Sequence, residues 1–142
     1  MGSSESVIAL DVGEKRIGVA IANGSVAIAI PYDTIEVDGT EISQIAQLIE
    51  TESVTRIIIG YPRNQSGEAT AQTAYVERFA DTLKELDVDI EFQDESLTSI
   101  HAEDRLKSQK QPYTKGDIDM VAASIILQDY LEQKAILIYI TQ

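Results

Sequence analysis

The sequence predicts an α/β protein built on a five-stranded mixed sheet with helices on both faces. Short β-prone apolar runs open the chain, and helical periodicity appears only after them. A short run with three consecutive isoleucines, Arg56–Gly60, then lies between two helical segments and indicates a fully buried strand. Three strands followed by helix–strand–helix–strand–helix give an antiparallel start and parallel crossovers, which place helices on both faces.

Each element follows from its local pattern. Asn23-Gly24 between two β-prone runs is a strong hairpin signal, so the first three strands should be consecutive and antiparallel. The expected strands are Val7–Val12, Arg16–Ala22, Ser25–Ile30, Arg56–Gly60 and Asp89–Asp94, and the expected helices are Thr40–Glu50, Ala71–Leu86, Ser99–Ser108 and Gly116–Gln133. Polar loops are expected at Tyr61–Thr70 and Gln109–Gly116, and Ala135–Ile140 reads as a last edge strand or an apolar tail.

Length and composition narrow the class of protein. A chain of 142 residues suits one domain, expected to span residues 1–142. The lack of cysteine excludes disulfides and thiolate zinc sites. No apolar stretch approaches the ~18 residues that span a bilayer, and no signal peptide is evident. We therefore expect a cytoplasmic protein with no membrane partner. The net charge of −13, taken alone, argues against nucleic acid.

Asp11 is the most informative residue because it interrupts an apolar strand. It stands between Val7–Leu10 and Val12, in the strand expected to be central and buried. An unpaired buried carboxylate is costly, so such a residue is normally ion-paired, hydrogen-bonded or bound to a metal. The alternative is a strand-end aspartate that hydrogen-bonds a turn.

Two adjacent acids, Asp94 and Glu95, close the last strand. Alternation places Asp94 on the same face as Ile90 and Phe92, so periodicity favours Asp94 as the inward-facing group. Because the strand ends here, alternation does not decide between the two carboxylates. A solvated strand end is the alternative for both.

Asp117 and Asp119 open the long C-terminal helix and differ in what they can do. Thr114 and Asp117 have the spacing of a capping box, which gives Asp117 a structural role. Asp119 instead begins an apolar stripe that should lie on the sheet, formed by Ala123, Ile126 and Tyr130. A carboxylate at the buried start of such a stripe indicates a function.

These carboxylates predict a divalent-metal site. One histidine and no cysteine leave oxygen atoms as the main ligands, and all-carboxylate sites suit Mg²⁺ or Mn²⁺ rather than zinc. Two such ions ~3.5–4 Å apart can activate a water and stabilise the leaving oxygen of a phosphodiester.

Four segments, in order, resemble motifs of the YqgF family, the Holliday-junction-resolvase-like nucleases of the ribonuclease H superfold. They are Ala9–Ala20, Ile59–Gly67, Asp94–Thr98 and Lys115–Ala123. The resemblance implies a ribonuclease H-like fold and an acidic triad of Asp11, Glu95 and Asp119, acting both as catalytic residues and as metal ligands. It selects Glu95 where alternation favoured Asp94. Ser96 stands where the family has arginine, which removes a partner for phosphate or carboxylate.

The resemblance further implies an endonuclease that needs Mg²⁺ or Mn²⁺ and cuts structured RNA or branched DNA. Its substrate would be precursor small-subunit ribosomal RNA or Holliday-junction-like DNA. The alternative is a non-catalytic ribonuclease H-like module that binds nucleic acid or protein, which the net charge and Ser96 favour. The motifs leave both a monomer and a homodimer open.

The distribution of charge along the chain weakens the argument against nucleic acid that the net charge alone suggested. The segments 33–52 and 77–91 each carry six acids, against no base in the first and two bases in the second. Basic residues gather instead in or beside the motif segments. The candidate nucleic-acid-binding residues are Lys15, Arg16, Arg63, Asn64, Arg105, Lys107, Lys110 and Lys115. Because bound divalent ions would neutralise part of the acidic site, we expect metal-dependent, salt-sensitive binding of nucleic acid on one face.

Overall fold

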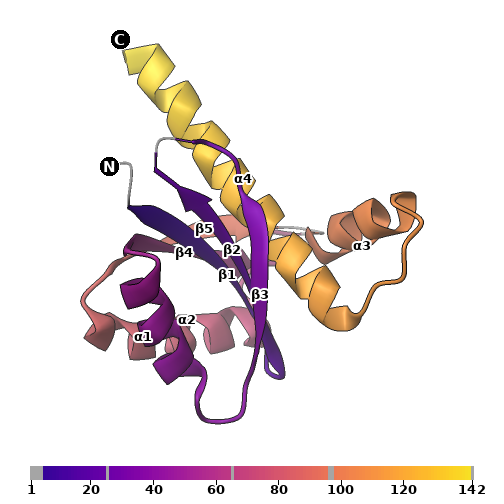
Figure 1. Ribbon diagram of the computed structural model, residues 1–142, viewed down its shortest axis with the longest axis horizontal. Helices are drawn as coiled ribbons and strands as arrows, with labels where there is room; N and C mark the ends of the chain where they lie inside the picture. Colours follow the sequence, from indigo (N-terminus) through magenta and orange to yellow (C-terminus); the bar gives the residue numbers. More distant parts are fainter. Residues whose placement is uncertain (1–4, 25, 65, 96–97, 142) are drawn as a thin grey trace.

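The computed structural model describes residues 5–24, 26–64, 66–95 and 98–141, and side chains are described for 5–24, 26–64, 66–95 and 102–135. Figure 1 shows a central sheet with helices on both sides. The strands are β1 (Ser6–Val12), β2 (Arg16–Asn23), β3 (Ile30–Glu36), β4 (Val54–Pro62) and β5 (Asp89–Glu95). The helices are α1 (Glu41–Thr51), α2 (Ala71–Leu83) with a 3₁₀ turn η1 (Lys84–Leu86), α3 (Thr98–Ser108) and α4 (Lys115–Thr141).

The sheet has the order β3-β2-β1-β4-β5. The pairs β1–β2 and β2–β3 are antiparallel, whereas β1–β4 and β4–β5 are parallel. This arrangement confirms the predicted mixed sheet with an antiparallel start and parallel crossovers. It also makes β1 the central strand, so Asp11 lies in the middle of the sheet.

Both faces of the sheet are covered, and strand alternation assigns each residue to one of them. Ile8, Leu10 and Val12 of β1 belong to the core that the sheet forms with α1 and α2. Val7 and Ala9 belong to a second core, formed with α4. By alternation Asp11 follows Val7 and Ala9 and lies on the α4 face.

Helix α4 is the only cover on its face among the described residues, and it contacts every strand of the sheet (Figure 1). Its buried residues Ala123, Ile126, Leu127 and Tyr130 pack on the small and β-branched side chains of β1, β2 and β4. Helix α3 packs in turn on the first half of α4, where Ala102 meets Val121 and Ala122. The predicted apolar stripe of the C-terminal helix therefore lies on the sheet.

The prediction of a strand at Ser25–Ile30 was wrong. The third strand begins only at Ile30, and the residues just before it hydrogen-bond to α4. The Gln128 side chain accepts a hydrogen bond from Ala29 N at 2.9 Å and donates one to Ala27 O at 3.2 Å. β3 lacks an apolar run because it is an edge strand and most of its side chains are exposed. The hairpin predicted at Asn23-Gly24 is confirmed as an antiparallel β2–β3 pair, but the connection runs from Asn23 to Ile30 and is longer than two residues.

The segment Ala135–Ile140 is neither an edge strand nor an irregular tail. It continues α4, which runs to Thr141 and extends past the sheet (Figure 1). The helix can continue because nothing between Gly116 and Thr141 breaks it: this stretch holds no proline or further glycine. Within the part of the chain that the structure describes, none of the helices is both long and apolar enough to cross a membrane.

The first turn of α4 lies directly on β2. A Cβ atom added at Gly18 would stand 1.9 Å from the Asp119 carbonyl oxygen. No side chain fits between the two backbones at this point, so the glycine fixes how closely the helix approaches the sheet.

Replacing Gly18 with alanine should therefore force α4 away from β2 and destabilise the protein by about 1–3 kcal/mol, the usual cost of overpacking. Gly116→Ala is the matched control, because the atoms nearest to its new Cβ lie at 3.5 Å or more and alanine favours a helix. Urea denaturation followed by circular dichroism measures both variants. Equal stability of the two would contradict the close approach.

Candidate functional site

Asp11 lies near the end of β1, on the face that α4 covers. Its partner across the antiparallel pair is Gly18. Burial, together with the nearby charges of Glu95 and Asp119, raises the pKa of the Asp11 carboxyl to about 8. Asp11 thus lies within range of the charges of both Glu95 and Asp119, although the three carboxylates come from separate elements.

Glu95 and Asp94 occupy opposite faces at the end of β5. Asp94 is exposed and pairs with Arg63, with 3.5 Å between Oδ1 and Nε. Glu95 lies on the α4 face, and burial raises the pKa of its carboxyl to about 7. Strand alternation does place Asp94 on the same face as Ile90 and Phe92. That face is the one covered by α1 and α2, however, whereas the carboxylates of the site lie on the face covered by α4.

Two glycines make room for these groups on the sheet. A Cβ added at Gly60 would stand 2.8 Å from Glu95 Oε2 and 2.7 Å from Ile126 Cδ1. Gly60 lies on β4 and Gly18 on β2, so they flank Asp11 on the central strand between them. The site is therefore a strip of the sheet in which Asp11 stands between two glycines, and Glu95 and the start of α4 pack against these glycines.

Asp119 and Asp117 have different roles in the first turn of α4. Asp117 completes the predicted capping box, since Thr114 N donates to its Oδ2 at 2.9 Å and Asp117 N donates to Thr114 Oγ1 at 3.1 Å. The Asp119 carboxylate accepts a hydrogen bond from Arg16 Nε, with 2.7 Å between Nε and Oδ2. Asp119 thus faces the sheet and already has a cationic partner.

The chemistry of the donor set fits Mg²⁺ or Mn²⁺, because three carboxylates converge on one face and such ions prefer oxygen ligands. Their geometry is not that of a finished metal site. Among the residues whose side chains are described, no three acidic or imidazole groups are close enough together to hold a metal ion. The carboxylate of Asp119 is ion-paired with Arg16.

A pocket of about 370 Å³ opens beside this ion pair. It is lined by Gly13, Glu14, Lys15, Arg16, Gln72 and Asp119. Sequence reasoning missed Gln72, whose side-chain amide donates to Val12 O at 3.0 Å and ties α2 to the end of β1. No sequence signal marks it, since a glutamine near a helix N-terminus is ordinarily solvated.

The other predicted nucleic-acid-binding residues are spread more widely. Lys15 is exposed in the turn between β1 and β2. Arg63 lies over the Tyr61 ring, 5.0 Å from its centroid, and pairs with Asp94. Asn64 shapes its own loop, because its Oδ1 accepts hydrogen bonds from Ser66 N and Glu68 N. The structure therefore brings only Lys15 and Arg16 of this group to the pocket.

Arg105, Lys107, Lys110 and Lys115 are all exposed on α3, on the loop that follows it and at the start of α4. Helix α3 packs on α4 next to the turn that carries Asp119 (Figure 1), so these basic residues lie on elements adjacent to that part of the site. Ser96, which departs from the family pattern, lies outside the described residues.

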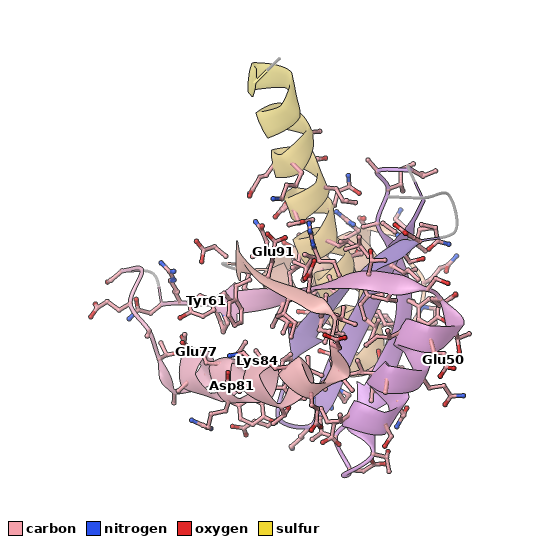
Figure 2. All side chains as sticks on the ribbon, turned by 90° about the vertical axis from the view of Figure 1, so that its left-hand side faces the viewer. Glu50, Tyr61, Glu77, Asp81, Lys84 and Glu91 are labelled. Atoms are coloured by element: carbon pink, nitrogen blue, oxygen red, sulfur yellow. The ribbon has the colours of Figure 1, made fainter. Side chains whose placement is uncertain are left out.

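Much of the acidic charge lies on the other side of the sheet. Figure 2 shows Glu50 on α1 and Glu77 and Asp81 on α2, and all three are exposed. These helices cover the face opposite α4. Glu91 is an exception, because it lies beside α4 and accepts a hydrogen bond from Tyr130 at 2.6 Å (Figure 2).

The fold matches solved structures of junction-resolving enzymes. Thermus thermophilus RuvC in complex with a Holliday junction substrate aligns with a TM-score of 0.59 at 11% identity, over 92% of this chain and 96% of that one. A fowlpox virus resolvase with Holliday junction DNA aligns with a TM-score of 0.53 at 13% identity, over 90% and 97% of the two chains. The protein is thus an α/β protein of the ribonuclease H-like fold.

The family follows from closer relatives. The family model "RuvX: Holliday junction resolvase" matches residues 5–133. The "Putative pre-16S rRNA nuclease" of Chloroflexus aurantiacus is 44% identical over 93% of this chain and 90% of its own length. The protein of the same name from Crocosphaera subtropica is 42% identical over 91% and 94%. The chain belongs to the RuvX family, as the YqgF-like motifs predicted.

The raised pKa values predict how stability depends on pH without metal. Asp11 and Glu95 hold protons in the folded state that the unfolded chain releases near pH 4, so their contribution is complete at low pH and is lost as pH rises through their folded pKa values of about 8 and about 7. Stability in a chelator should fall by at least about 1 kcal/mol between roughly pH 5 and pH 8, because one pKa unit corresponds to ~1.4 kcal/mol.

Asp11→Asn should flatten this decline, since the amide cannot ionise. Urea denaturation at several pH values, with the chelator present throughout, measures the slope for both proteins. A wild-type stability that rises over this range, or an unchanged slope in the variant, would show that Asp11 ionises normally in the folded state.

Proposed function

We propose that this protein is a divalent-metal-dependent endonuclease that hydrolyses phosphodiester bonds in structured nucleic acid. The observation that carries the proposal is the gathering of Asp11, Glu95 and Asp119 on one face of the sheet, where Asp11 feels the charges of the other two. Membership of a family described as Holliday junction resolvases, and relatives named as pre-16S rRNA nucleases, support the same activity.

Asp11, Glu95 and Asp119 would hold Mg²⁺ or Mn²⁺. A bound divalent ion supplies an activated water and stabilises the charge that develops on the scissile phosphate. Asp11 provides a carboxylate on the central strand, whose position the sheet fixes. Glu95 lies over Gly60, and Asp119 reaches the site from the first turn of α4.

The substrate we favour is precursor small-subunit ribosomal RNA in the cytoplasm, with branched DNA as the alternative. The names of the relatives support the RNA, and the family description supports the DNA. Lys15 and Arg16 are placed to meet the phosphate nearest the acidic face, since both line the pocket beside Asp119. The exposed basic residues of α3 and of the start of α4 would contact phosphates further along the nucleic-acid backbone.

Removing any one of the three carboxylates should abolish cleavage. Asp11→Asn, Glu95→Gln and Asp119→Asn should each lower the cleavage rate by more than ~100-fold, because removal of a ligand exceeds the 10–100-fold effect of outer-shell changes. The assay compares a precursor rRNA fragment, a four-way DNA junction and an RNA–DNA hybrid, each with Mg²⁺ or Mn²⁺.

The sequence supplies a neighbouring control for two of these variants. Asp94→Asn changes the exposed acid beside Glu95, and Asp117→Asn changes the capping acid near Asp119. Both should keep the rate within about threefold, as is usual for surface ion pairs and caps. Activity that survives Asp11→Asn would overturn the assignment, and wild-type protein that takes up no Mn²⁺ would favour a non-catalytic binding module.

Lys107 and Lys110 should contribute to affinity rather than to chemistry. Their joint replacement by glutamine should weaken nucleic-acid binding and reduce the salt dependence by up to about two ions, since each phosphate contact releases roughly one counterion. Lys84→Gln in the turn η1 is the control, because Lys84 pairs with Asp81 of α2 on the opposite side of the sheet. Anisotropy titrations over a range of salt concentrations measure the slope, and an equal slope in all three proteins would contradict this binding path.

A further inference from the structure

The Arg16–Asp119 ion pair joins the start of β2 to the start of α4. The distance between Arg16 Nε and Asp119 Oδ2 is 2.7 Å, and the two side chains are only 29% and 22% exposed. A hydrogen bond between two charged groups is short and about twice as strong as a neutral one. The carboxylate that the proposed metal site needs from α4 is therefore engaged by a cation of the protein itself.

The backbone of Asp119 cannot come closer to the sheet. Its carbonyl oxygen lies where a Cβ atom of residue 18 would stand, so the start of α4 is already in contact with β2. Rotation of its side chain is the smallest movement by which the Asp119 carboxylate can change partner. Release thus depends on what else the Arg16 guanidinium can bind.

A phosphate group is suited to replace Asp119 at Arg16. The guanidinium binds phosphate and carboxylate through the same planar set of donors. The pocket of about 370 Å³ gives access to it, and both Lys15 and Arg16 line that pocket. A nucleic-acid phosphate that enters would meet two cations and compete with Asp119 for one of them.

We propose that Arg16 is a positioning residue that keeps Asp119 away from the metal site until a phosphate of the substrate binds the Arg16 guanidinium. The inference rests on the proposed function and adds an order of events to it. Substrate binding releases Asp119, and the released carboxylate completes the metal site. The arrangement explains why three acids share one face while no three described side chains form a metal site.

Linkage gives the proposal a measurable consequence. If a phosphate and a metal ion each favour the separated pair, each must raise the affinity of the other by the same factor. The free protein should then bind metal weakly, and the loss of Arg16 should strengthen that binding without any substrate present.

Mn²⁺ binding to the free protein provides the test, with electron paramagnetic resonance reporting the unbound ion. Arg16→Gln should bind Mn²⁺ roughly five- to tenfold more tightly than wild type, the effect of removing one partly shielded ion pair. Arg16→Lys should lie between the two, because it keeps the charge and loses the planar donors. Lys15→Gln removes a neighbouring positive charge that does not touch Asp119, so it measures simple charge repulsion and should have the smaller effect.

An Asp119→Asn background separates release of the carboxylate from general electrostatics. With Asp119 removed, Arg16→Gln should no longer strengthen Mn²⁺ binding beyond the effect of Lys15→Gln. If it strengthens binding equally in both backgrounds, Arg16 acts by repulsion alone and the proposal is overturned.

A second measurement tests the coupling directly. The affinity of a fluorescently labelled RNA hairpin is measured by anisotropy with and without saturating Mn²⁺, in the cold, and gels verify that the strand is intact. The gain in affinity from Mn²⁺ should be smaller in Arg16→Gln than in wild type. An equal gain in the two proteins contradicts the proposal.

Failure of the two proposals can be told apart by Asp11→Asn. If that variant binds Mn²⁺ as wild type does, the metal site itself is wrong. If it weakens Mn²⁺ binding while Arg16→Gln leaves it unchanged, the metal site stands and only the role of Arg16 is wrong.

Discussion

The close approach of α4 to the sheet is the constraint on which the rest of this structure depends. The helix contacts all five strands, and its first turn reaches the backbone of β2 because Gly18 has no side chain. Gly60 leaves similar room on β4. Between these two strands runs β1 with Asp11, so the contact that packs the helix also defines the floor of the acidic site. The residues that let α4 pack on the sheet are therefore also the ones that surround the candidate site.

This packing gathers negative charge that the fold has to accommodate. Burial and mutual repulsion raise the pKa of Asp11 to about 8, and burial raises the pKa of Glu95 to about 7. The Asp119 carboxylate is neutralised by Arg16. Further along α4, Tyr130 joins the helix to the sheet by accepting a hydrogen bond from Arg56 at 2.7 Å and donating one to Glu91. In the free protein, Arg16 therefore offsets the repulsion between carboxylates at the start of α4, and Tyr130 holds a later part of the same helix to the sheet.

Local patterns predicted the elements well where they are buried and poorly where they meet solvent. The apolar runs of β1, β2 and β4 and the periodicity of α1 and α2 are visible in the sequence because both sheet faces need apolar residues. The third strand was predicted too early, at Ser25–Ile30, since the exposed edge strand β3 carries no apolar run, and the residues before it hydrogen-bond to Gln128, about a hundred residues away. For Glu95, alternation was sound, but which face holds the site depends on where α4 packs.

The sequence by itself determined the order of the strands and helices, the capping role of Asp117 and the presence of unexplained acids at Asp11 and Asp119. Those features depend on neighbours within a few residues. Only the tertiary structure decided that Gln72 reaches β1 and that Arg16 holds Asp119 across 103 positions of the chain. Such contacts depend on how closely α4 approaches the sheet, a distance that no local pattern encodes.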